Sequence, residues 1–106
     1  ICVAYVEKTW EVLVNPEIIE RSRGLVASTE GCLSLPKSEL PVQRHEEIVV
    51  NYHTAHGEAR IFRASGMDAI VLQHEIDHLD GVLILDRTTR NARRHWLRRA
   101  GFALLP

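Results

Sequence analysis

The sequence predicts an α+β domain in which antiparallel strands pack around one central helix, followed by a C-terminal helix. Three observations lead to this prediction. Short runs rich in β-branched residues alternate with turn residues over the first 63 positions, a strongly patterned helical segment follows at 66–79, and an arginine-rich segment closes the chain. Because 106 residues suit one domain, we expect a single domain over residues 1–106.

The first two strands are expected at residues 1–6 and 10–14, where apolar and β-branched residues gather on either side of a short polar turn. The pair Asn15-Pro16 should break the second strand, because proline lacks the N–H that a strand ladder needs. Residues 17–20 can then resume as another short strand.

Two prolines, Pro36 and Pro41, frame a segment that we expect to be an irregular loop. A hairpin should follow it, with strands at 47–54 and 58–63 joined by a turn at His56-Gly57. These two strands are therefore predicted to be antiparallel partners.

The helix predicted at 66–79 carries both start and stop signals. Ser65 can act as N-cap, Asp68 resembles a capping-box acid three residues on, and Gly81 stands just past the end. One continuous stripe runs along the helix at helical spacing: Met67, Ile70, Val71, His74 and His78. We expect this arrangement to bury the two histidines beside an apolar wall.

A second helix is predicted at 89–100, with Gly101 as its stop and arginines toward its C-terminal end, where they suit the helix dipole. The net charge is −1, but residues 1–86 hold 7 basic and 14 acidic side chains, whereas residues 87–106 hold 6 arginines and no acid. Residues 87–106 thus form a basic helix or tail. It could dock on nucleic acid or an acidic partner, or it could be a solvated helix face.

The sequence gives no sign of a membrane partner, since no apolar run approaches the ~20 residues that a span needs, and no secretory leader is visible. Its two cysteines are too few for a disulfide scaffold, so we expect a reducing, cytoplasmic location. Cys2 lies in an apolar run and should be a small buried hydrophobe, whereas Cys32 lies between glycine and polar residues.

The run His74-Glu75-Ile76-Asp77-His78 indicates a metal site on the central helix. Residues i and i+4 share one helix face, so the two imidazoles can bind the same divalent ion, and Glu75 can reach a water on it. A chance pattern on a polar helix face is the alternative.

A catalytic site of the zinc type needs a third protein ligand. The metzincin pattern would put a histidine where this chain has Ile84, and no glutamate follows Glu75 to serve as in gluzincins. Cys32 is the best remaining candidate, because a thiolate binds zinc and iron well and Gly31 allows a tight loop. Its rivals are His45, His53 and His56.

Two longer motifs resemble those of the peptide deformylases. That family is marked by E-G-C-L-S and Q-H-E-x-D-H-L, and this chain has Glu30-Gly31-Cys32-Leu33-Ser34 and Gln73-His74-Glu75-Ile76-Asp77-His78-Leu79. The segments Asn15-Pro16-Glu17 and Asp80-Gly81-Val82-Leu83 are also similar to the family, so the resemblance covers roughly residues 1–90.

The resemblance implies a metal-dependent hydrolase that removes the N-formyl group from the formyl-methionine of nascent polypeptides and releases formate. It implies one divalent metal, Fe2+ first, with Zn2+ or Ni2+ able to take its place, held by Cys32, His74 and His78. Glu75 would be the general base and then the acid, and the Leu33 N–H an oxyanion donor. Substrate would contact the following residues: Gly31, Leu33, Met67, Ile70 and Val71.

The family's third motif, G-x-G-x-A-A-x-Q, is absent, so the domain is expected to lack its N-terminal portion. A sequence incomplete at its start, a fragment completed by a partner and a degenerate relative all fit this absence. Two other functions stay open: a zincin-like endopeptidase, and an inactive remnant that binds metal or docks on the ribosome. The docking face would be formed by Arg90, Arg93, Arg94, Arg98 and Arg99.

Overall fold

The computed structural model describes residues 1–32 and 35–99, without the side chains of residues 32 and 35–38. It contains two antiparallel sheets and three helices, which confirms the predicted α+β class. The larger sheet has the strand order β1-β2-β5-β6, and β3 and β4 form the smaller one. The elements are β1 (Cys2–Val6), β2 (Thr9–Arg21), β3 (Leu25–Cys32), β4 (Leu35–His45), β5 (Glu47–His53), β6 (Ala59–Ser65), α1 (Gly66–Leu79), α2 (Ile84–Arg87) and α3 (Arg90–Arg99).

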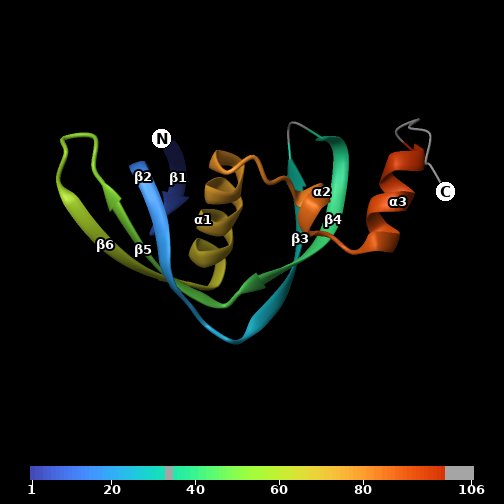
Figure 1. Ribbon diagram of the computed structural model, residues 1–106, viewed down its shortest axis with the longest axis horizontal. Coiled ribbons are helices and arrows are strands. Elements are labelled where there is room, and N and C mark those ends of the chain that lie inside the picture. Colours follow the sequence, from blue (N-terminus) through green and yellow to red (C-terminus); the bar gives the residue numbers. More distant parts are fainter. Residues whose placement is uncertain (33–34, 100–106) are drawn as a thin grey trace.

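Helix α1 stands between the two sheets, which diverge from a base where β2 runs into β3 and β4 runs into β5 (Figure 1). Backbone hydrogen bonds join the two crossings at this base, from Ser22 N–H to the Glu47 carbonyl (2.9 Å) and from Glu46 N–H to the Gly24 carbonyl (3.0 Å). Because both sheets share this base, α1 can present one face to each of them.

Strand β2 is longer than expected. The prediction of a break at Asn15-Pro16 was wrong, because β2 runs from Thr9 to Arg21 and pairs with β5 through two register shifts, one between Val14 and Glu17. Asn15 takes a positive φ of 51° there, a conformation that asparagine tolerates better than most residues. The proline is thus accommodated at a bulge.

The segment framed by Pro36 and Pro41 is a strand, β4, and the prediction of an irregular loop was wrong. Leu40, Val42 and Arg44 are buried in alternation with exposed Pro41 and Gln43, the two-residue period of a half-buried strand. A strand in a two-stranded sheet has an unpaired edge, where a missing N–H is tolerated. The predicted hairpin of β5 and β6 is confirmed, with Gly57 at φ +85° in its turn.

The predicted helix at 66–79 is confirmed, but its buried face differs from the predicted stripe. The buried residues are Ala69, Leu72, Gln73 and Ile76. Of the stripe, Met67 is 70 % exposed and the other four members are half-buried, so the apolar wall is a partly open surface. Ser65 makes no side-chain capping bond, whereas Gly81, at φ +74°, ends the helix as expected.

The C-terminal helix is confirmed as α3, Arg90–Arg99, while Gly101 lies outside the described residues. A short helix that the sequence did not predict, α2, precedes it. Ile84 of α2 is buried with Leu40 and Val42 of β4, and Ala92 and Trp96 of α3 pack against that cluster. None of the helices described is both long and apolar enough to cross a membrane.

Candidate metal centre

His74 and His78 lie on the face of α1 that looks toward the small sheet. One turn of helix brings their rings together, so that the two Nε2 atoms are 2.9 Å apart and the ring planes meet at 76°. The His74 side chain is only 17 % exposed. The two nitrogens are at hydrogen-bonding distance from each other, and a sheltered pair of this kind is a candidate for binding one metal ion.

Glu30, near the end of β3, fixes the orientation of His74. Its Oε1 lies 2.8 Å from Nδ1 of His74. Burial would raise the pKa of Glu30, but hydrogen bonds from Arg44, His74 and Ser28 outweigh it and lower the pKa to about 2. An ionised carboxylate can only accept, so Nδ1 of His74 carries the proton and its Nε2 has a lone pair, which accepts the hydrogen bond from Nε2 of His78 and is the pair that a metal would use.

Arg44 of β4 holds Glu30 in turn. Its Nε and Nη2 donate to the two Glu30 oxygens at 2.9 and 2.7 Å, and its Nη1 donates to Oδ2 of Asp77 at 2.6 Å. Burial would lower the pKa of Arg44, but bonds to the two carboxylates raise it above its ordinary value. Every fully buried side-chain nitrogen or oxygen among the described residues has a hydrogen-bond partner. The network is therefore saturated and preorganised for His74.

Gln73 attaches the same helix to the end of β4. Its Oε1 accepts from the His45 N–H at 2.9 Å, and its Nε2 donates to the carbonyls of His45 (2.8 Å) and Ala69 (2.9 Å). In the sequence, Glu30, Gln73 and Asp77 belong to the two motifs, but no role was predicted for them. Arg44 was not identified at all. The sequence signal that could have found this arginine is its two-residue spacing from Val42 and Leu40, which puts all three on one face of a strand.

Glu75, the predicted proton carrier, is half-buried one position after His74. The pKa of Cys2 in β1 is raised, first by burial and then by the nearby charge of Glu75. The carboxylate therefore lies within electrostatic reach of β1. Cys2 is a buried free thiol, as the sequence predicted, so it is not tied up in a disulfide.

The remaining predicted ligand, Cys32, ends β3, where its backbone pairs with Leu35 after a register shift. Its side chain lies outside the described part of the structure, and so does the whole of Leu33, the predicted oxyanion donor. Within residues 1–31 and 39–99, whose side chains are described, no three His, Cys, Asp or Glu side chains form a metal-binding group. The third ligand therefore stays a prediction.

The rival histidines lie elsewhere. His45 Nδ1 is 2.8 Å from the Ser22 carbonyl oxygen at the base of the sheets. His53 and His56 are exposed at the far hairpin of β5 and β6. Of the predicted substrate contacts, Gly31 is exposed on β3, Met67 is exposed on α1, and Ile70 and Val71 are half-buried on α1.

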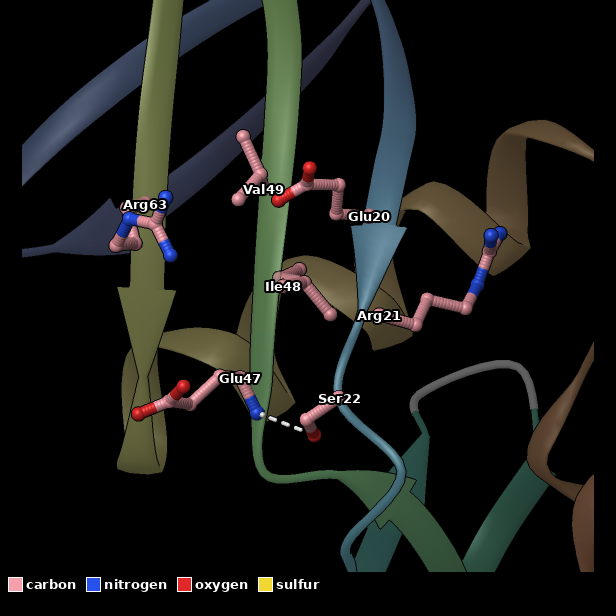
Figure 2. A pocket seen from close by; sticks show the side chains of 7 residues that line it. All are labelled: Glu20, Arg21, Ser22, Glu47, Ile48, Val49 and Arg63. Carbon is pink, nitrogen blue, oxygen red and sulfur yellow. Dashed lines mark hydrogen bonds between the residues drawn. The ribbon is translucent and has the colours of Figure 1, made fainter.

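A separate hollow of about 310 Å³ lies where β2 leaves β5 (Figure 2). It is lined by Glu20, Arg21, Ser22, Glu47, Ile48, Val49 and Arg63. Val49 of β5 is the register partner of both Glu20 on β2 and Arg63 on β6. At the rim of the hollow, the Glu47 N–H donates to Ser22 Oγ (3.1 Å). Neither histidine of the pair contributes to it, so this hollow is separate from the candidate metal centre.

A family model described as Polypeptide deformylase matches residues 2–94. The peptide deformylase of Dictyoglomus thermophilum is 55% identical over 76 residues, which cover 72% of this chain and 49% of that protein. The peptide deformylase of a Picosynechococcus species is 46% identical over 94 residues, or 88% of this chain and 50% of that protein. The chain thus spans about half the length of the curated relatives it matches.

Solved structures give the same result. A peptide deformylase from Synechococcus elongatus in complex with actinonin matches with a TM-score of 0.83 and 38% identity, over 92% of this chain and 54% of that one. The peptide deformylase of Thermus thermophilus matches with a TM-score of 0.78 and 44% identity, over 92% of this chain and 59% of that one.

Proposed function

Because the chain belongs to the polypeptide deformylase family, we propose that it carries the metal-binding part of a hydrolase acting on nascent polypeptides. The reaction would remove the formyl group from an N-terminal formyl-methionine and release formate. The observation that carries this proposal is the His74–His78 pair, with its Nε2 atoms 2.9 Å apart and His74 oriented by ionised Glu30.

The donor set fits one divalent metal. Two imidazole nitrogens converge, and a carboxylate behind the first fixes its tautomer, as is usual for metal-bound histidine. Cys32 would supply the third ligand, and a thiolate beside two imidazoles suits Fe2+, with Zn2+ or Ni2+ as alternatives. Such an ion, when bound, acts as a Lewis acid and makes water more acidic.

The chain's own residues would move the protons. Glu75 would take a proton from the attacking water and pass it to the leaving amine as the C–N bond breaks, which yields formate and a free N-terminus. The Leu33 N–H would donate to the oxyanion, and Gly31 would pair with the substrate backbone. Met67, Ile70 and Val71 would contact the methionine side chain, since together they form a partly open apolar strip on α1.

Formate release from a formyl-methionyl peptide by the full-length gene product, loaded with Fe2+ without oxygen, tests this function. We expect release to fall by about 10²–10⁴-fold in Glu75→Gln, the range typical of a lost general acid–base. Glu58→Gln, an exposed acid in the far hairpin, is the matched control and should release formate normally. Internal cleavage of an unformylated peptide without formate release would instead favour the endopeptidase.

The ligand set has its own test. We expect Cys32→Ala to lose its bound metal, because two imidazoles alone hold a divalent ion weakly. Metal content after gel filtration measures this, with Cys2→Ala as the control at a buried thiol on β1. Stoichiometric metal in Cys32→Ala would contradict the proposed ligands.

We propose, as a second function, that α3 docks on the ribosome in the cytoplasm. Helical spacing puts Arg90, Arg94 and Arg98 on the side opposite Ala92 and Trp96, which pack against the protein. Replacing these three arginines with glutamine should abolish co-sedimentation with ribosomes at low salt. Docking without formate release from a metal-loaded protein would favour the inactive remnant.

A further inference from the structure

A continuous series of charged side chains leads from the surface of α2 to His74. Arg87 donates from Nε and Nη2 to the two Asp77 oxygens, at 3.1 and 3.0 Å. Asp77 accepts from Arg44, Arg44 donates to Glu30, and Glu30 accepts from His74, all within 2.9 Å. Charges alternate from Arg87 to Glu30, so each of the three inner members, Asp77, Arg44 and Glu30, has a partner on both sides.

Arg87 is the outermost member of the series, and together with Arg44 it balances the negative charges of Asp77 and Glu30. Arg44 and Asp77 are only 4 % and 13 % exposed, whereas Arg87 is 50 % exposed. Without Arg87, the single cation of Arg44 would face two carboxylates. Among the contacts that the structure describes, Oδ1 of Asp77 has Arg87 as its only donor. An Asp77 deprived of that donor would compete with Glu30 for the Arg44 guanidinium.

The position of Arg87 is fixed from both sides. Ile84, one turn before it, is 1 % exposed against β4, and Thr88, directly after it, donates from Oγ1 to the Pro41 carbonyl at 2.7 Å. The side chain is therefore presented to Asp77 by anchored backbone. This differs from Arg60, similarly exposed at 54 %, whose partner Glu58 is itself 60 % exposed in a hairpin.

We infer that Arg87 is a positioning residue for the metal ligand His74, acting through Asp77, Arg44 and Glu30. This inference rests on the proposed role of His74 as a ligand. Arg87 keeps Arg44 aligned on Glu30, and Glu30 then holds the His74 ring with Nε2 directed toward His78, where the metal would bind. Outer partners of metal-binding histidines typically contribute about 10- to 100-fold in metal affinity. Arg87 reaches Glu30 only through Asp77 and Arg44, so we expect its contribution to lie at the lower end of this range.

Arg87 could instead act merely by tethering α2, and two substitutions separate these roles. Thr88→Val removes one of the two anchors of α2, while buried Ile84 still holds this helix on β4, so the Arg87–Asp77 pair should stay in place. Arg87→Lys keeps the charge but cannot form the two-pronged contact. If tethering were the whole effect, Thr88→Val would resemble Arg87→Gln.

The experiment measures Zn2+ affinity of the full-length protein by competition with a chelator, together with the ¹⁵N shift of His74 Nδ1, which reports its protonation. For Arg87→Gln we expect about tenfold weaker binding and a loss of the pure Nδ1–H form, with partial recovery in Arg87→Lys. Thr88→Val and the control Arg60→Gln should stay within about twofold of the parent protein. Unchanged affinity in Arg87→Gln, or an equal loss in Thr88→Val, would overturn the inference.

His74→Ala, measured in the same way, separates this inference from the proposed function. If His74→Ala binds Zn2+ like the parent protein, the proposed metal centre fails. If His74→Ala loses Zn2+ while Arg87→Gln does not, only the role of Arg87 fails. Should Arg87→Gln not fold, Arg87→Lys alone decides the question, because we expect it to bind Zn2+ more weakly than the parent protein does. Parent-like affinity and Nδ1 shift in Arg87→Lys would overturn the inference.

Discussion

The two faces of α1 meet two different kinds of interior. Toward the large sheet, Ala69 and Leu72 pack with Ile48 and Val50 in a core that excludes charge. Toward the small sheet, the same helix meets Glu30 and Arg44, which are 8 % and 3 % exposed and fully hydrogen-bonded. Apolar packing tolerates small shifts, whereas a saturated ionic network fixes direction. The apolar contacts with the large sheet therefore keep the helix in place, and the ionic network on the side of the small sheet orients its histidines.

Removing Arg44, the central cation of the ionic network, should cause the largest loss of stability. Arg44→Met keeps much of the side-chain volume but leaves Glu30 and Asp77 without their shared partner. Because a buried carboxylate that loses its partner is costly, we expect a loss of about 3–5 kcal/mol in the free energy of unfolding. Urea denaturation of the metal-free protein measures this. A loss similar to that of Arg60→Gln, an exposed pair, would show that the network is not truly buried.

An apolar truncation tests the other side of the helix. Leu72, at 0 % exposure, packs in the core of the large sheet, and Leu72→Ala should cost about 2–5 kcal/mol through lost burial and a residual cavity. Zn2+ affinity of the molecules that remain folded should change little, because the network behind His74 is untouched. A tenfold loss of affinity would mean that the two faces of α1 are not separable.

Neutralising the carboxylate next to His74 should weaken Zn2+ binding, whereas Leu72→Ala should lower stability and change Zn2+ binding little. Glu30→Gln retains the shape of the side chain but removes the charge that selects the Nδ1–H tautomer of His74. We expect Zn2+ binding to weaken by about 10- to 100-fold, which corresponds to roughly 1.4–2.7 kcal/mol. Chelator competition measures the affinity, and Glu58→Gln in the exposed hairpin is the control. Unchanged affinity would remove Glu30 from the metal centre.

The sequence predicted the apolar side of the fold better than the charged side, for physical reasons. Alternation and turn residues located β1, β5 and β6, and the spacing of His74 and His78 placed both rings on one face of α1. Strand β4 was missed because its prolines mask the alternation of Leu40, Val42 and Arg44. The network around Arg44 was missed because its members come from β3, β4, α1 and α2, and only tertiary structure brings them together.

The smallest expected effect on stability concerns the turn at Gly81, which follows the end of α1. Gly81 has φ +74° and open space around its Cβ, so Gly81→Ala meets backbone strain alone, which we place at about 1 kcal/mol. Gly57→Ala, at φ +85° in the hairpin, should lose the same stability and serves as the matched control. The Gly81 and Val82 N–H groups donate to His78 and Asp77 carbonyls, so relaxing this turn would disturb the end of α1 that carries His78 and Asp77. Zn2+ affinity should therefore fall by about three- to tenfold in Gly81→Ala and stay unchanged in Gly57→Ala. Equal affinities in the two variants would show that the histidines are oriented independently of the turn that ends α1.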